Sequence, residues 1–430
     1  MRYLLLFLTI VLLFMHPDSS AAEEMVTVKL VNKVGETSQL NFELKGGYFS
    51  FDSTLNLQEG VRYTLTVLND NSLLLKGAGN EHKVGGSLVL IPEKYDKKHQ
   101  IYINETPYLG AVEFSIENKK FIRPINQLPL EDYLKGVVPL EVYPSWGIET
   151  LKAQTLAART YAMSHVSKTM DDTTQFQVYG GYAWSKDTTR AVNETAGEVI
   201  TYKDQLINAF YSASNGGVTE NNTHVWGEKP MSYLPIKEDP YDPVHPWVFT
   251  LHQTQIKLKD INWDNPDWWG ETEEKDEPTT SSMKRWLQKK GYTGDIKILS
   301  IPHFELSNQT LKSGRRVKGS ITIEFLQRLV EGTVLFQQLE LKDVRLDNVR
   351  PLIGGLLFKS YFIDSLKESD GVYTMKGKGF GHGVGMSQWG AHYMGLKGKT
   401  YKQIIQFYYP KTSIMELTDY KSASLSKKAR

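Results

Sequence analysis

One acidic side chain stands out because of its neighbours. Glu141 lies between Leu140 and Val142, in a break between two helical patterns where the side chains are almost wholly apolar. Burial of a carboxyl group in apolar surroundings disfavours its charged form, so such a group can hold a proton near neutral pH and act as a general acid. The same position also suits a helix cap, or an ion-pair partner of Arg159 or Lys152. This stretch alone leaves the three interpretations open.

A second group of polar side chains lies in a glycine-rich stretch near the C-terminus. Glycine alternates with larger residues from Gly377 to Gly385, His382 lies within this run, and Ser387 and Gln388 follow it. Glycine at every second position of a strand leaves one face without side chains, so that another chain can approach the backbone. We expect a groove that admits a polymer. The stretch does not have the GxGxxG pattern of a phosphate-binding loop. It also lacks the GxSxG motif that a Ser–His hydrolase would need around its nucleophile.

The composition excludes several other kinds of site. The sequence contains no cysteine, which rules out disulfides, thiolate catalysis and cysteine–zinc sites. Its ten histidines are scattered and show no HxxxH or HExxH spacing, so we predict neither a metal nor a cofactor. The net charge of +1 gives no field that would favour nucleic acid or an anionic membrane.

The N-terminal segment is typical of an exported protein. Arg2 precedes an apolar run from Leu4 to Met15, and Ala21 and Ala22 supply a signal-peptidase site. We predict a cleaved signal peptide over residues 1–22; the alternative is an uncleaved membrane anchor. Export without cysteine indicates the outer face of a bacterial cell that has no second membrane.

Two helices and many short strands must position these side chains. Pro129 suits the first turn of a helix that ends near Val138, because Gly136 and Pro139 oppose its continuation. A second helix begins after residues 144–145 with a core-facing stripe that extends to position 166. Short alternating runs separated by turns predict strands over residues 25–118 and 296–345, and a helix is expected from about position 400. The fold class is therefore α+β, with a β-rich N-terminal region.

Several blocks of the sequence occur together in a recognisable order. They are residues 130–139 (LEDYLKGVVP), Glu141, 151–161 (LKAQTLAARTY), 177–180 (QVYG), 211–220 (YSASNGGVTE), 313–315 (SGR) and 381–391 (GHGVGMSQWGA). Together these blocks resemble the SpoIID/LytB family of bacterial cell-wall proteins, whose name joins sporulation stage II D proteins and amidase enhancers. The match covers about 290 residues.

The resemblance implies an enzyme that acts on peptidoglycan. Sporulation-type members are lytic transglycosylases whose catalytic acid matches Glu141, and they prefer glycan that an amidase has stripped of stem peptides. By the same resemblance, a substrate groove is expected to be lined by Arg159, Tyr211, Ser212, His382, Ser387 and Gln388. The other branch of the family implies an alternative, a non-catalytic protein that binds the wall and enhances an N-acetylmuramoyl-L-alanine amidase. A plain sugar-binding β protein is disfavoured, because Glu141 lies in a helical break.

The resemblance also suggests domain limits. We expect a β-rich region over residues 23–118, packed on a mixed α+β catalytic domain over 119–415 that contains the helical pair and the substrate groove. An acidic, tryptophan-rich insertion covers about 251–295, and a basic tail over 416–430 is expected to be disordered. The insertion tryptophans could stack on sugars or pack internally. Some family members bind zinc through His and Cys, but this chain has no cysteine, so no metal is carried over.

Overall fold

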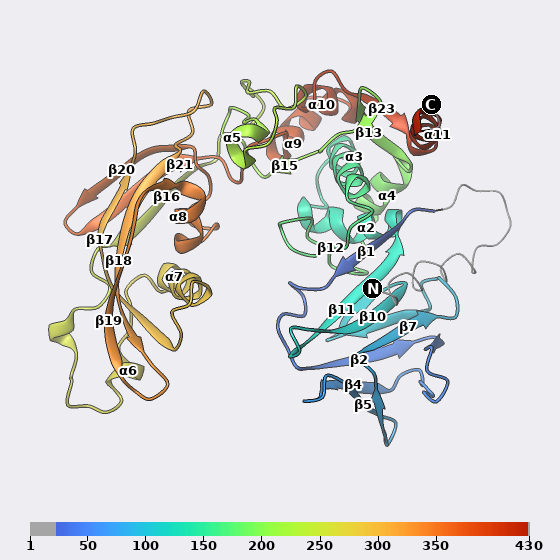
Figure 1. Cartoon of the computed structure of the whole chain (residues 1–430). Helices are drawn as coiled ribbons and strands as arrows, with labels where there is room; N and C mark the ends of the chain where they lie inside the picture. Colours follow the sequence, from blue (N-terminus) through green and yellow to red (C-terminus); the bar gives the residue numbers. More distant parts are fainter. Residues whose placement is uncertain (1–22, 429–430) are drawn as a thin grey trace. The chain divides into compact units, whose positions relative to one another are not determined.

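The computed structural model describes residues 23–428 and confirms an α+β fold with a β-rich N-terminal region (Figure 1). The predicted signal peptide lies outside the described residues. The chain forms two compact units. The first contains the residues up to Ala209 together with Gly398–Gln406 and Lys411–Arg430, and the second contains Phe210–Lys397 with Phe407–Pro410. Within residues 23–428, no helix is both long and apolar enough to cross a membrane.

Two six-stranded sheets form the N-terminal part of the first unit. Their orders are β12-β1-β11-β10-β7-β3 and β6-β5-β4-β2-β8-β9. Alternation between buried and exposed positions, clearest in β2, puts one face of each strand into a shared core. The strands are β1 (Met25–Lys29), β2 (Gln39–Lys45), β3 (Tyr48–Phe49), β4 (Arg62–Val67), β5 (Leu73–Gly77), β6 (Asn80–Val84), β7 (Ser87–Pro92), β8 (Gln100–Ile103), β9 (Thr106–Tyr108), β10 (Ala111–Glu117), β11 (Phe121–Pro129) and β12 (Met170–Asp171).

The predicted helical pair is present, but its limits differ from those expected. Pro129 is the last residue of β11 and the N-cap of α2, which spans Leu130–Glu141 and contains Pro139. The helix continues past Gly136, where only glycine fits: a Cβ on Gly136 would lie 2.4 Å from the carbonyl oxygen of Gly181. Pro139 has no N–H to donate to the carbonyl oxygen four residues earlier, and α2 ends two residues after it. The second helix, α3, spans Ile148–Ser164.

The rest of the first unit surrounds this pair. Helix α3 packs against α2, α4 and β13. The predicted disordered tail is wrong, because residues after position 416 form helix α11. The elements are α4 (Lys186–Glu194), β13 (Glu198–Tyr202), β14 (Gln205–Leu206), α10 (Tyr401–Tyr408, whose last two residues belong to the second unit), β23 (Ser413–Glu416) and α11 (Leu417–Lys428).

The second unit contains two three-stranded sheets, β16-β21-β20 and β17-β18-β19, and a parallel pair, β15-β22. Helices α7 and α8 pack on each other and on the second sheet. The elements are β15 (Tyr211–Ser212), α5 (Asn222–Trp226), β16 (Pro246–His252), η2 (Leu258–Asp260), α6 (Trp268–Glu271), α7 (Glu277–Lys289), β17 (Asp295–Leu306), β18 (Lys318–Arg328), β19 (Val334–Arg345), α8 (Leu346–Ile353), β20 (Ile363–Ser369), β21 (Val372–Lys378), β22 (Met386–Ser387) and α9 (Gln388–Leu396).

In the tryptophan-rich segment, one of the tryptophans belongs to the core. Trp269 is buried, and its ring lies 4.7 Å from the Arg328 guanidinium and 5.6 Å from Lys297 Nζ. It packs in a small cluster with Leu299 and Leu326, whereas Trp263 is exposed. Packing, the second of the two predicted roles, therefore describes Trp269.

Candidate functional site

Glu141 is the last residue of α2, and its carboxyl group is held by a neighbouring loop. The side chain is half-buried, and its Oε1 accepts a hydrogen bond of 2.9 Å from the backbone N–H of Val178. Because a backbone donor has a fixed direction, this bond helps to orient the carboxyl group. The chain then turns away from the helix at Val142, whose backbone is extended.

The loop that contains Val178 is fixed to α2 and to the sheet beneath it. The N–H of Gly180 donates to the carbonyl oxygen of Gly136, at 3.1 Å. The ring of Tyr179 is buried, and its hydroxyl donates to Oδ1 of Asn126 in β11, at 2.8 Å. The buried residues on both sides of Val178 therefore hold its N–H next to Glu141, which gives the QVYG block a structural role.

The surroundings of Glu141 differ from the apolar pocket that the sequence predicted. Leu140 is 42% exposed and Tyr143 is 60% exposed, so apolar side chains flank the carboxyl group at the surface and do not enclose it. The hydroxyls of Tyr133 and Tyr161 are close enough to feel its charge. Burial raises the pKa of both tyrosines, and the nearby carboxylate of Glu141 adds to the effect, so both stay protonated near neutral pH.

The two cations proposed as ion-pair partners of Glu141 pair with other carboxylates. Lys152 Nζ lies 2.7 Å from Glu194. Arg159 donates from Nε and Nη2 to the two oxygens of Glu131, at 2.8 and 2.7 Å. Glu141 does lie at the end of α2, as the helix-cap interpretation expects, although its carboxyl group accepts from the N–H of Val178 in a neighbouring loop.

Arg159 offers no surface to a substrate. Its side chain is fully buried, and beyond the ion pair with Glu131 it donates to the carbonyl oxygens of Val192 and Glu198. A buried guanidinium with these partners fixes α3 to its neighbours. The expectation that it lines a groove is therefore wrong in this structure, and the sequence misled because Glu131 lies 28 positions away.

In the second unit, the glycine-rich stretch is a loop and not the strand that was predicted. Strand β21 ends at Lys378, and Gly379, Gly381, Gly383 and Gly385 all have positive φ, between 74° and 101°. The protein itself occupies the space beside these glycines. A Cβ on Gly383 would lie 2.1 Å from Arg315 Nη2, and one on Gly385 would lie 2.0 Å from a backbone oxygen. The missing side chains thus allow internal packing, and the expected approach of a polymer to a bare strand face is not supported.

Three of the predicted polar residues in this unit lie together but are buried. Strands β15 and β22 put Ser212 beside Ser387. Ser387 is the N-cap of α9: its Oγ accepts from the N–H of Gly390 at 3.0 Å and donates to Asp242 at 2.6 Å. The Ser212 hydroxyl accepts from the N–H of Gly383, and Gln388 is only 8% exposed. Ser212 and Ser387 therefore hold the loop in place.

His382 and Tyr211 are half-buried and retain some exposed surface. The His382 ring lies 5.1 Å from that of Trp226, and its Nδ1 accepts from the N–H of Val384 at 3.0 Å. Burial and, to a smaller extent, the positive charge of Arg315 together lower the pKa of His382 to about 4, while a hydrogen bond with the Tyr211 backbone opposes the shift. The imidazole is therefore neutral at physiological pH.

An ion pair that the sequence did not reveal joins the remaining blocks. Arg315 donates from Nη2 to the carbonyl oxygens of Asn215 and Val218, at 2.8 and 3.0 Å, and its Nη1 lies 4.0 Å from Glu220. Glu220 is fully buried and also accepts from the hydroxyl of Ser313. Burial lowers the pKa of Arg315 to about 10, an effect that Glu220 opposes, so the guanidinium stays charged. The pair connects the SGR, NGGVTE and GHGVG blocks.

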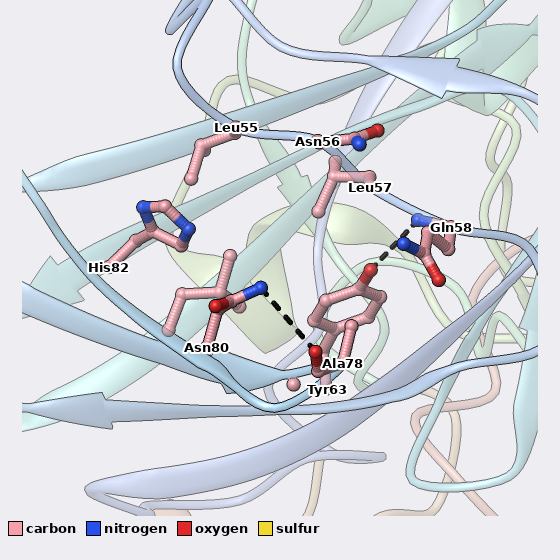
Figure 2. A pocket seen from close by; sticks show the side chains of 10 residues that line it. Leu55, Asn56, Leu57, Gln58, Tyr63, Ala78, Asn80 and His82 are labelled. Atoms are coloured by element: carbon pink, nitrogen blue, oxygen red, sulfur yellow. Dashed lines mark hydrogen bonds between the residues drawn. The ribbon is translucent and has the colours of Figure 1, made fainter.

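A small pocket in the N-terminal region contains none of the predicted site residues. It lies between the loop that precedes β4 and the turn between β5 and β6, and Tyr63, Asn80 and His82 are among its lining residues. Figure 2 shows that the Tyr63 hydroxyl accepts from the N–H of Gln58, at 2.8 Å, and that the Asn80 amide points to the carbonyl oxygen of Ala78. These groups are directed at the protein's own backbone, so the pocket gives no indication of a ligand.

No metal centre was predicted, and residues 23–428 contain no cluster of three or more His, Cys, Asp or Glu side chains that could hold a metal ion. Of the predicted site residues, Glu141 and Arg159 lie in the first unit. Tyr211, Ser212, His382, Ser387 and Gln388 lie in the second.

The sequence is similar to a family model and to several known proteins. A family model described as "Stage II sporulation protein" matches residues 118–202, which contain α2, α3 and the Val178 loop. The amidase enhancer of Bacillus subtilis (strain 168) is 38% identical over 413 residues, 94% of this chain and 57% of that protein. An uncharacterised protein of Brachyspira hyodysenteriae (strain ATCC 49526 / WA1) is 31% identical over 326 residues, 73% of this chain and 74% of that protein.

Stage II sporulation protein D of Bacillus amyloliquefaciens is 27% identical over 326 residues, 71% of this chain and 79% of that protein. The chain thus spans little more than half the length of the amidase enhancer and about three quarters of the other two relatives.

Proposed function

The chain belongs to the SpoIID/LytB family of bacterial cell-wall proteins, and we propose that it is a lytic transglycosylase that cleaves peptidoglycan glycan strands. The single observation that carries this proposal is the position of Glu141. Its carboxyl group ends α2, is oriented by the Val178 N–H, and lies between two exposed apolar side chains. An oriented carboxyl group beside apolar surface is the arrangement that protonation of a glycosidic bond needs.

In the proposed reaction one carboxyl group acts twice. Protonated Glu141 donates its proton to the oxygen that links N-acetylmuramic acid to N-acetylglucosamine, and the bond from the muramic C1 to that oxygen breaks. The resulting carboxylate accepts the proton of the muramic 6-hydroxyl, whose oxygen bonds to C1 and closes a 1,6-anhydro ring. The glutamic acid is regenerated and no water is consumed. The Val178 N–H keeps one carboxyl oxygen in place through both steps.

The second unit, taken by itself, offers two further polar groups. Tyr211 and His382 keep exposed surface there, and we propose that they bind glycan on that unit. Since His382 is neutral, it can donate or accept a hydrogen bond without placing a positive charge beside the sugar. Ser212, Ser387 and Gln388 would act by positioning the loop, because they are buried.

We propose a place of action outside the cytoplasm, in the wall of a Gram-positive type of bacterium, with glycan free of stem peptides as substrate. The predicted signal peptide and the family both favour this location. A role in sporulation would follow from the matching family description.

A second candidate function is that of a non-catalytic amidase enhancer. It is favoured by the relative that bears this name and aligns with 94% of this chain. This protein would then bind the wall and act through an N-acetylmuramoyl-L-alanine amidase, and Glu141 would contribute binding only.

Mass spectrometry of purified glycan strands separates the two functions. Strands with and without stem peptides are incubated with the protein alone, and with the protein plus an amidase. A transglycosylase acting alone releases fragments that end in 1,6-anhydromuramic acid and weigh one water less than hydrolysis products. An enhancer leaves the strands intact and accelerates the amidase.

A further inference from the structure

Tyr143 is an aromatic side chain that is unusually exposed for its size and lies two residues after Glu141. It is 60% exposed, although burying a tyrosine ring away from water is favourable. The charge, spacing and glycine patterns of the sequence do not single it out, and its place becomes informative only when the geometry of the turn after α2 is known.

The backbone puts Tyr143 and the carboxyl group on the same side of the chain. Val142 is extended, with φ −137° and ψ 161°, and its side chain is buried in the core. Successive side chains of an extended segment point to opposite sides, so Glu141 and Tyr143 both point away from the core. A rise of about 3.3 Å per residue separates their Cα atoms by roughly 6.6 Å. Tyr143 therefore follows Glu141 on the same side of the chain, with one buried residue between them.

The turn that follows Tyr143 fixes the ring in place. The N–H of Trp146 donates to the carbonyl oxygen of Tyr143 at 3.0 Å and closes a four-residue turn with Pro144 in its second position, where proline pre-sets the backbone. The two rings pack at 5.5 Å between centroids with an interplanar angle of 53°. Trp146 in turn packs against the hydrophobic core. Because these contacts already hold the Tyr143 side chain, a ligand that binds its ring loses little free energy to ordering it.

We propose that Tyr143 is the platform on which the N-acetylhexosamine ring next to the scissile bond stacks. The C–H face of a pyranose is apolar and packs on an aromatic ring, while the hydroxyl groups at its edge stay in water. Leu140, 42% exposed on the other side of Glu141, extends the same apolar surface. This inference rests on the proposed function for the identity of the sugar, and it adds a residue that binds the glycan without taking part in proton transfer.

The test measures binding of stem-peptide-free glycan strands to the Glu141→Gln protein, which cannot transfer a proton. Tyr143→Ala is expected to weaken binding about tenfold, the effect of losing one aromatic contact with its buried area. Tyr143→Phe keeps the ring and is expected to bind within about twofold of the parent. Tyr143→Leu keeps apolar bulk without an aromatic face and is expected to resemble the alanine variant. Phe51→Ala removes another exposed aromatic ring of the same unit, 54% exposed, and is the control that should change nothing.

The outcomes are separate from those of the proposed function. In the active protein, Tyr143→Ala should raise KM more than it lowers kcat. If Tyr143→Ala binds as tightly as the parent, or weakens no more than Phe51→Ala, the platform is refuted even if the wild type makes anhydro ends. If the parent protein binds no strands at millimolar concentration, the platform is refuted as well. If strands bind through Tyr143 but are never cleaved, the platform stands and the transglycosylase proposal fails. Melting temperatures within a few degrees of the parent exclude misfolding as the cause of any loss.

Discussion

Gly383 should be required for folding of the second unit and not for admitting a polymer. Replacement by alanine puts a Cβ 2.1 Å from Arg315 Nη2 at a backbone φ of +74°. The left-handed backbone alone costs about 1–2 kcal/mol for a residue with a Cβ. Arg315 must then move, and its two bonds to the carbonyl oxygens of Asn215 and Val218 are buried and charge-assisted, each worth about 1.5–3 kcal/mol. The expected loss in free energy of unfolding is therefore at least about 4 kcal/mol.

Chemical denaturation of Gly383→Ala measures this loss, and Gly332→Ala is the matched control. Gly332 has a similar φ of +92° in the same unit, but no atom lies within 4 Å of its would-be Cβ. The control should cost only the backbone strain, about 1–2 kcal/mol. If both variants lose the same stability while Gly383→Ala alone loses glycan binding, the internal packing described here is wrong and the glycine face does admit substrate.

Three further predictions concern charged or titrating groups. Glu131→Gln leaves the fully buried Arg159 guanidinium without its anion, so the free energy of unfolding should fall by about 3–5 kcal/mol. Activity per folded molecule should be unchanged. A loss of activity without a loss of stability would instead indicate that Arg159 lines the substrate groove. His382 has a pKa near 4 in the folded protein and near 6.5 unfolded, so the unfolded chain binds the extra proton and stability should fall by up to about 3 kcal/mol as the pH drops from 6.5 to 4. His382→Asn should flatten that part of a stability–pH curve, and an unchanged slope would contradict the burial of the imidazole. Asp132→Asn removes the negative charge and one of the two oxygens that accept from the Tyr95 hydroxyl and the Lys135 ammonium, so it should lower the melting temperature yet leave glycan cleavage near normal. The opposite ordering would make Asp132 part of the chemistry.

Local patterns predicted the elements well where tertiary contacts agree with them. Alternating residues gave the N-terminal strands, and the stripe along residues 148–164 gave α3, because both patterns record which face is buried. The end of α2 could not be predicted. Gly136 and Pro139 oppose a helix in isolation, yet α2 extends to Glu141, and the close approach of Gly181 that requires glycine at position 136 is a tertiary contact.

The sequence indicated where the candidate residue Glu141 lies, but not which groups surround it. Glu141 was found because a carboxyl group among apolar residues is conspicuous, yet the bond from Val178 depends on a loop 37 positions away. The glycine run was taken for a strand because sequence shows spacing and not the sign of φ. Arg315 and Glu220 were not recognised as an ion pair, since they are 95 positions apart and neither lies in a chemically distinctive pattern.

The most direct test of the central claim compares the wild type with Glu141→Gln on purified, stem-peptide-free glycan strands, with products identified by mass spectrometry. The substitution keeps the size of the side chain and its acceptor for the Val178 N–H but cannot transfer a proton. We expect 1,6-anhydromuramic ends from the wild type, also in the presence of a chelator, and turnover at least ~10²-fold lower in the variant with little change in melting temperature. Unimpaired cleavage by a folded Glu141→Gln protein would contradict it.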